Sequence, residues 1–392
     1  MNSPTLASPG NQRVTFVELF FDLVFVFSVT QVVGLFHDGI QLHAVGQGIL
    51  VFWMIWWAWT QFTWTLNAAD TTHDVVELAT MLGTAVAFFM GVAVPDAFQG
   101  RAAWFAIPYV LVRSIGLYIY GHVARASPGQ HQAVRTFTFL AVGGMVAVLV
   151  GGFMSGTAQY ALWTLGILLD VLAAAVGGRS ENWDLHAEHF VERHGLFVII
   201  ALGETLIVAA AGLTGAQWNA NLFFIATLAI AITCVFWWTY FTRAKPALDQ
   251  ALESCRGSTQ STMARDAFSL AHFPVLCGVI AYAAALEQAI AHPNDAFSLA
   301  ARLALAAGVL LFVGGMALPI WRSSRQLRWP RVWLSALAAS LLIVFSDSPP
   351  TLALAIALIG VTAVAVWEHR TLPAAVPAQP AHHDVLTIRR SS

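Results

Sequence analysis

The sequence predicts an all-α fold, a polytopic bundle of about twelve transmembrane helices. Of its 392 residues, 58% are hydrophobic and only 10% are charged, whereas an ordinary soluble domain has about 25% charged residues. A helix needs about 20 apolar residues to cross the hydrocarbon core of a bilayer, and stretches of this kind recur along nearly the whole chain. The predicted spans are 14–36, 43–65, 77–95, 102–122, 136–155, 159–178, 195–213, 220–241, 267–290, 297–320, 331–347 and 350–367.

The distribution of Lys and Arg supports this number of spans independently of hydropathy. Positive charge concentrates in cytoplasmic loops, and with the N-terminus inside, the outer side keeps only Arg101 and Arg302, while Arg113 falls within a span. An even number of spans then predicts that both termini are cytoplasmic. The inner side holds Arg13, Arg125, Arg135, Arg179, Arg193, Arg243, Lys245, Arg256, Arg265, Arg322, Arg325, Arg328, Arg331, Arg370, Arg389 and Arg390.

Two recurring dipeptides indicate that the bundle consists of two parallel six-helix repeats. Phe16-Val17 recurs as Phe197-Val198, and Trp56-Trp57 recurs as Trp237-Trp238, each pair at the same offset along the chain. Many transporters are built from such repeats. The predicted organisation is a cytoplasmic N-terminal segment, two transmembrane halves and a Pro- and Ala-rich disordered tail, at residues 1–13, 14–180, 181–370 and 371–392.

Charged residues inside the spans are the candidate functional residues. A charge at mid-bilayer costs about 2.5–3.5 kcal/mol on insertion scales, so it normally faces a partner or water. Glu18 and Asp22 lie four residues apart in the first span, on one helix face, where like charges force proton uptake or a shared cation or arginine. The alternative for Glu18 is a shallow position that reaches interfacial water.

A second polar cluster precedes and enters the seventh span. Glu204 follows about two and a half turns into the apolar run, which predicts a depth near mid-membrane. Three interpretations remain open for the cluster: a solvated loop, an ion-pair or proton relay, and a metal site. H-E-x-x-H is absent, so we predict no metal and no cofactor. The cluster comprises His186, Glu188, His189, Glu192, Arg193 and His194.

Asp170 and Arg113 complete the set of embedded charges. Arg113 is the one basic residue that the span assignment places deep in a helix, so acids exceed bases and the remainder must be protonated or bind a cation. Five tryptophans between residues 52 and 64, with Trp57 and Trp64 among them, suit either an interfacial belt and packing or a surface that accepts cations.

Three stretches resemble the bacterial low-temperature-requirement A (LtrA) family. They are "VELFFDLVFVFSVTQ" at 17–31, "WTQFTWTLNAAD" at 59–70 and "HFVERHGLFVIIALGETLI" at 189–207. The resemblance implies a family domain over about residues 10–370 and a location in the bacterial cytoplasmic membrane, but no substrate or reaction. By resemblance, the motif positions are Glu18, Asp22, Trp64, Asn67, Asp70, His189, Glu192, Arg193, Gly195 and Glu204.

The leading functional hypothesis is a cation- or proton-linked transporter or channel. Asp22 and Glu204 would form its central acidic site, and Glu18, Asp170 and Arg113 would support them. A gate or relay on the inner side would comprise His189, Glu192, Arg193, His186 and His194.

Two alternatives come from other classes of protein. One is a membrane-embedded enzyme that acts on a lipid or isoprenoid through the His/Glu cluster, and the other is a structural component without catalysis. The predicted partners are membrane lipids and a cation or proton. A net charge of -2 without a basic face argues against nucleic acid.

Overall fold

A computed structural model describes residues 6–9, 12–177, 183, 185–214, 219–324, 328–345 and 348–371. The described residues form helices and short turns, in agreement with the predicted all-α class. The helices of the first half are α1 (Phe16–Gly34), α2 (Leu42–Ala68), α3 (Asp74–Val92), α4 (Ala102–Val123), η1 (Ala124–Ala126), α5 (Pro128–Gly151) and α6 (Thr157–Gly177).

The second half contains three π-helical segments, η2, η3 and η4, that continue α-helices across the membrane. Its helices are α7 (Ala187–Leu213), α8 (Ala220–Thr239), η2 (Tyr240–Ala244), α9 (Lys245–Ser254), α10 (Gly257–Met263), η3 (Ala264–Leu270), α11 (His272–Ala291), α12 (Leu299–Val309), η4 (Leu310–Gly314), α13 (Ala317–Ser324), α14 (Trp329–Val344) and α15 (Pro350–Thr371).

Eleven helical segments in the described part of the chain are long and apolar enough to cross a membrane, and α14 is a shorter apolar helix. Together they account for the twelve predicted crossings. At the seventh span α7 begins at Ala187 instead of residue 195, a shift as large as that of α5, which begins at Pro128 instead of residue 136. The polar residues before 195 are helical because α1 and α2 supply partners for them. The predicted disordered tail lies, from residue 372 onward, outside the described residues.

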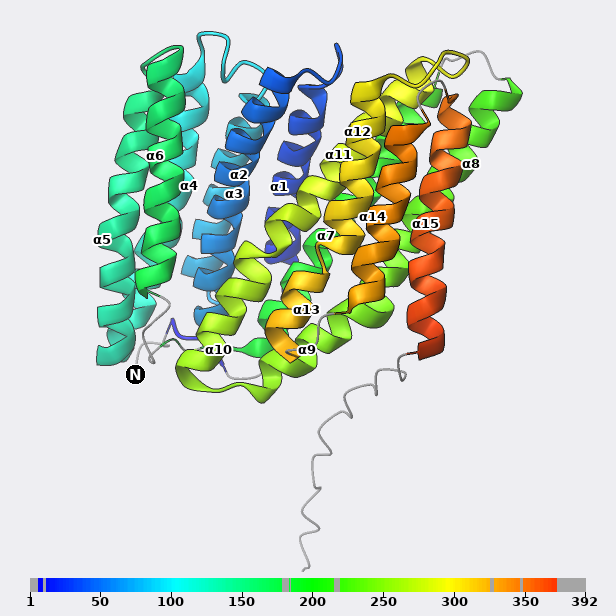
Figure 1. Ribbon diagram of the computed structural model, residues 1–392. Coiled ribbons are helices and arrows are strands. Elements are labelled where there is room, and N and C mark those ends of the chain that lie inside the picture. Colours follow the sequence, from blue (N-terminus) through cyan, green and yellow to red (C-terminus); the bar gives the residue numbers. More distant parts are fainter. Residues whose placement is uncertain are drawn as a thin grey trace, which may run out of the picture.

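The helices run side by side, with α5 and α6 at one edge of the bundle and α8 and α15 at the other (Figure 1). Within the first half α1 packs on α3, α3 on α4, α4 on α5 and α5 on α6. Within the second half α7 packs on α11, α11 on α12, α12 on α14 and α14 on α15. The two halves meet where α1 contacts α7 and α11 and where α2 contacts α7.

Apolar side chains cover the outside of the first helix, whereas its acids face inward. Phe16, Phe20 and Leu23 are exposed, but Glu18 and Asp22 are fully buried. A helix that is apolar on its outer face as well as its inner one is typical of a membrane span. The exposed apolar face of α1 therefore suits lipid, and its acids face protein.

Glycines permit the closest helix contact in the second half. A Cβ added at Gly278 would lie 3.1 Å from the Gly308 carbonyl oxygen and 2.6 Å from the Phe312 nitrogen. Small residues allow membrane helices to approach backbone to backbone. Gly278 and Gly308 therefore set the spacing of α11 and α12.

Both described ends of the chain lie at the same end of the bundle, together with α9 and α10 (Figure 1). The N-terminal segment is held there because the Ser8 amide donates to the Ala68 carbonyl and the Asp70 amide donates to the Leu6 carbonyl. We call this the terminal end of the bundle, and the opposite one the far end. The start of α7 belongs to the terminal end.

At the far end, the turn after α1 contacts α11. The His37 Nδ1 atom lies 2.6 Å from Glu287 Oε1, and the Gln288 amide donates to the Phe36 and His37 carbonyls at 3.4 Å. Glu287 thus pairs with an exposed histidine near the end of its helix.

This pair gives a pH-dependent prediction. The hydrogen bond and negative charge of Glu287 raise the pKa of His37 above its ordinary value of about 6.5. A raised histidine pKa stabilises the fold fully below the unfolded-state pKa, and this contribution disappears as pH rises through the folded-state pKa. We expect a histidine NMR titration to show a higher midpoint for His37 in the wild type than in Glu287→Gln. Equal midpoints in the two proteins would contradict the pairing.

Candidate functional site

The centre of the interface between the two halves is a buried group of four ionisable side chains on α1 and α7. Glu18 Oε1 lies 3.1 Å from His189 Nε2 and 3.5 Å from Arg193 Nη1. Arg193 Nη2 also forms a close ion pair with Asp22 Oδ1. The exposure of all four side chains is 0–1%. We call these residues, Glu18, Asp22, His189 and Arg193, the α1–α7 charge network.

Helix geometry explains why these four residues meet. Glu18 and Asp22 are one turn apart on α1, and His189 and Arg193 are one turn apart on α7. The contacts Glu18–His189 and Asp22–Arg193 join residues separated by the same number of positions, so the two helices run in the same direction and keep the same register over this turn. The predicted repulsion between the two acids is therefore relieved by a shared arginine.

The first helix turn also uses Glu18. The Thr15 backbone amide and hydroxyl both donate to Glu18 Oε2 at 3.0 Å, and the amide contact belongs to a capping box between Thr15 and Glu18. Glu18 Oε1 remains directed at His189 and Arg193. Glu18 is therefore both a helix cap and a network member, and it does not reach interfacial water.

Two residues of α2 orient the network. The Trp59 indole N–H donates to Asp22 Oδ1 at 2.7 Å, and the Arg193 guanidinium lies over the Trp59 ring at 5.7 Å from its centroid. Asn67 Oδ1 accepts the His186 backbone N–H at 2.9 Å, which leaves the Asn67 amide nitrogen to face His189 Nδ1 at 3.2 Å. Trp59 and Asn67 thus hold one side chain from each helix.

The contact with Asn67 determines the protonation of His189. An amide nitrogen donates, so His189 Nδ1 must accept, and the ring proton lies on Nε2 facing Glu18. A doubly protonated ring would place two donors against each other. With His189 neutral, two carboxylates share one arginine, and the network carries one uncompensated negative charge.

Several network atoms still have hydrogen-bonding capacity. Asp22 Oδ2, Arg193 Nε and Arg193 Nη1 make no hydrogen bond to the described residues. Buried polar atoms are paired in the great majority of cases, with protein or with water. The network thus keeps a free acceptor, Asp22 Oδ2, and free donors on Arg193.

A polar cavity at the terminal end reaches the network through His189. Its wall includes His186, Glu188, His189, Glu253 and Arg256. His189 is the network member in this wall. His189 therefore lies between the polar cavity and Glu18.

Arg113 and Asp170 form a separate buried ion pair between α4 and α6, with Arg113 Nη1 at 2.6 Å from Asp170 Oδ1. Tyr109 donates to Asp170 Oδ2 at 3.1 Å, and Arg113 Nε donates to Gln61 Oε1 at 2.7 Å. The pair contains one positive and one negative charge, so it has no net charge. The structure does not join it to the α1–α7 charge network, contrary to the supporting role that the sequence suggested.

The structure does not bring Asp22 and Glu204 together. Glu204 follows Arg193 by eleven positions on α7, a rise of about 16 Å at ~1.5 Å per residue. The Thr30 hydroxyl of α1 is its polar neighbour, and Glu204 Oε1 makes no hydrogen bond to the described residues. The parallel course of α1 and α7 thus places Asp22 opposite Arg193 and leaves Glu204 further toward the far end.

The residues predicted as an inner gate separate into different environments. Arg193 and His189 belong to the network, His186 lines the polar cavity, and Glu192 is exposed. His194 is buried, its Nδ1 lies 2.9 Å from the Phe190 carbonyl, and its ring lies edge-on to Trp59. The cluster therefore does not assemble as one centre, and among the described residues no group of three metal-ligating side chains gathers.

The aromatic and polar motif residues also divide. Trp57 and Trp64 line a second cavity, described below. Asp70 accepts from the Thr72 amide and hydroxyl at 3.0 and 2.7 Å, so it shapes the turn after α2. Trp59 is fully buried in contact with the network, which supports packing and cation contact for it instead of a place in an interfacial belt.

Sequence reasoning missed several buried partners. Trp59, Gln61 and Tyr109 were not singled out, although a polar atom within a span is the signal that could have found them. Arg113 is not the one deeply buried base, because Arg193 and Arg331 are also fully buried. Arg331 Nη1 lies 2.8 Å from Glu368 Oε1, so α15 supplies a partner that turns this arginine inward.

Comparison with known proteins gives one family. The family model described as "Bacterial low temperature requirement A protein (LtrA)" matches residues 13–366. The chain is also similar to an uncharacterized protein of Rhizobium meliloti (strain 1021), with 29% identity over 374 residues that cover 92% of this chain and 90% of the relative. No solved structure matches the chain.

Proposed function

The chain belongs to the bacterial low-temperature-requirement A family, and from this premise we propose that it is a proton- or cation-linked membrane transporter or channel. The α1–α7 charge network is its ion-binding site. The bundle lies in the bacterial cytoplasmic membrane with both termini inside, since the positively charged loops alternate in that sense.

One observation carries the proposal: two buried carboxylates share a single arginine. A buried charge without a partner is costly, so the network favours binding of one positive charge. A proton on Asp22 or Glu18, or a small cation beside Asp22 Oδ2, supplies it. Ionisable residues inside membrane bundles mark proton relays and ion pathways.

Further polar groups along the same helix interface support passage of the ion. The polar cavity at the terminal end gives access through His189. Toward the far end, Glu204 offers a carboxylate beside Thr30 of α1. The ion would move between Glu18, Asp22 and Glu204 along the contact of α1 and α7.

The packing order supports two repeated halves at residues 14–180 and 181–370. In the first half, α1 packs on α3, and α3 to α6 then pack in chain order. In the second half, α7 packs on α11, and α11, α12, α14 and α15 pack in chain order in the same way. Transporter sites lie at the interface of such repeats. The α1–α7 charge network occupies this position, because α1 opens the first half and α7 opens the second.

Flux through reconstituted liposomes tests the proposal. We expect wild-type protein to move protons, Na⁺ or K⁺ down an imposed gradient, measured with a pH-sensitive or cation-sensitive dye inside the vesicles. Asp22→Asn and Glu18→Gln remove the uncompensated charge, so their flux should fall close to that of protein-free vesicles. Glu192→Gln is the matched control, because Glu192 is exposed on the same helix, next to Arg193.

Glu192→Gln should keep the wild-type rate. The proposal fails if Asp22→Asn and Glu18→Gln both transport as well as the wild type. It also fails if the wild type moves none of the three ions.

A further inference from the structure

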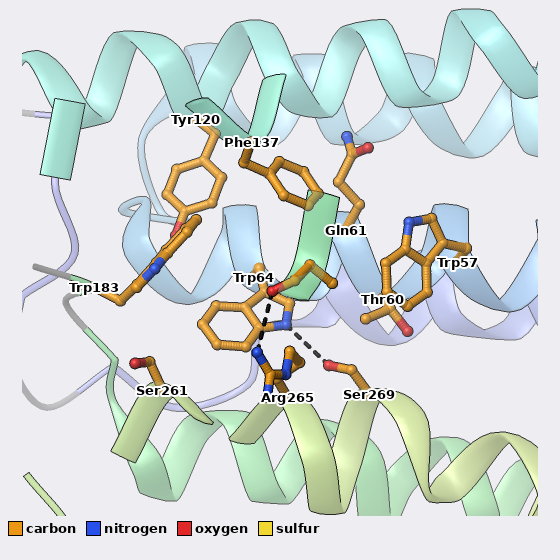
Figure 2. A pocket seen from close by; sticks show the side chains of 11 residues that line it. Trp57, Thr60, Gln61, Trp64, Tyr120, Phe137, Trp183, Ser261, Arg265 and Ser269 are labelled. Atoms are coloured by element: carbon orange, nitrogen blue, oxygen red, sulfur yellow. Dashed lines mark hydrogen bonds between the residues drawn. The ribbon is translucent and has the colours of Figure 1, made fainter. Parts of the chain in front are cut away.

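A second cavity lies between the two halves, walled by α2, α4, α5 and α6 on one side and by α10 and η3 on the other. The cavity is partly open to the surroundings of the protein. Figure 2 shows aromatic rings of Trp57, Trp64, Phe137 and Trp183 around this space, with Arg265 below Trp64. The cavity is thus a mainly aromatic chamber with a cation at one wall.

In the second half, the cavity wall includes the π-helix η3, which accepts hydrogen bonds from α2 of the first half. The Trp56 indole donates to the Ser269 carbonyl at 2.7 Å, and the Trp64 indole donates to the Ser269 hydroxyl at 3.0 Å. His272 Nδ1 lies 2.8 Å from the Ala267 carbonyl. π-Helical turns inside α-helices occur frequently at functional sites, and this one carries Arg265.

Charge balance at this wall favours an anion. Arg265 Nη2 lies 2.6 Å from Asp266 Oδ1, and Arg322 Nε lies 3.0 Å from Asp266 Oδ2. Two arginines share one carboxylate, which leaves one positive charge in excess. Among the described residues that line the cavity, Arg265 is the charged one.

The polar groups of the wall add a hydrogen-bonding requirement. The Thr60 hydroxyl is buried and makes no hydrogen bond to the described residues. Since buried polar atoms are normally paired, a ligand atom or a water belongs beside it. The aromatic walls accept a flat apolar body, while Arg265 and Thr60 supply donors for an anionic head.

We propose that this cavity binds a small organic anion with a flat apolar body, held at its anionic end by Arg265. The inference deepens the proposed function, on which it rests for the role of the ligand as the transported substrate. Binding itself needs neither a gradient nor a membrane, so it is measured separately from flux.

Calorimetric titration of the purified full-length protein in detergent, with benzoate as the probe, tests the inference. We expect saturable binding of benzoate, and much weaker binding of benzyl alcohol and benzylamine, which share the ring but carry zero or positive charge. Arg265→Gln should weaken benzoate binding by about tenfold or more, the size of one charge-assisted hydrogen bond.

Arg322→Gln separates direct contact from charge balance, because Arg322 shares Asp266 with Arg265 but does not line the cavity. It removes the excess positive charge, so it should weaken benzoate binding, but less than Arg265→Gln does. If Arg265→Gln fails to fold, Arg265→Lys should keep part of the affinity. Ala174→Leu, which fills the cavity from α6, should remove it.

Three results would overturn the inference: no saturable benzoate binding to the wild type, equal binding of benzylamine, or full affinity in both Arg265→Gln and Ala174→Leu. If Asp22→Asn loses flux but the wild type does not bind benzoate, this inference fails and the proposed function stands. Binding that depends on Arg265, combined with unchanged flux in Asp22→Asn and Glu18→Gln, rejects the proposed function alone.

Discussion

Arg193→Met is expected to lower the free energy of unfolding by about 3–5 kcal/mol, the usual cost of removing one partner from a buried ion pair. Glu18 and Asp22 remain buried without their shared cation, and methionine keeps the length of the side chain. Chemical unfolding in detergent micelles, followed by tryptophan fluorescence, measures the loss. Glu192→Gln on the same helix should stay close to the wild type, because surface substitutions usually change stability little.

Neutralising the acids separates stability from function. The triple variant Arg193→Met, Glu18→Gln, Asp22→Asn removes all three charges, so most of the lost stability should return. Its ion flux should nevertheless stay absent, because the ion-binding charge is gone. A purely structural network predicts the opposite result, with flux restored together with stability. If Arg193→Met destabilises no more than Glu192→Gln does, the ion pairs contribute nothing and the site loses its physical basis.

Arg113→Met is expected to cost a similar amount, about 3–5 kcal/mol. Asp170 would remain buried with the Tyr109 hydroxyl as its hydrogen-bond donor, and Gln61 would lose the Arg113 Nε donor. The same unfolding measurement applies.

The double variant Arg113→Met, Asp170→Leu replaces the whole pair by apolar groups, which is often neutral or stabilising. Because this pair is balanced and separate from the α1–α7 charge network, the double variant should regain stability and keep wild-type ion flux. A folded double variant without flux would assign Arg113 and Asp170 to the transport path. The contrast between the two ion pairs therefore distinguishes a structural pair from an ion-binding one.

Hydropathy and charge spacing were sufficient to predict the fold class and the embedded acids. Apolar stretches of about 20 residues leave few alternatives to membrane-spanning helices, because every backbone polar group must be paired inside the bilayer. Glu18 and Asp22 could be placed on one face from the helix period alone. These predictions depend on residues close in sequence, for which local geometry is fixed.

The partner of each acid was decided only by the tertiary structure. Asp22 pairs with Arg193 and not with Glu204, and Asp170 takes Arg113. A membrane helix that is apolar on every side carries little information on how it is rotated or offset against its neighbours, and lipid supplies no hydrophobic force that would fix either. The sequence by itself therefore determined that the acids within the spans, such as Asp22 and Asp170, must be buried. Helix packing determined that two acids share one arginine. The site therefore has one positive charge fewer than it has negative charges.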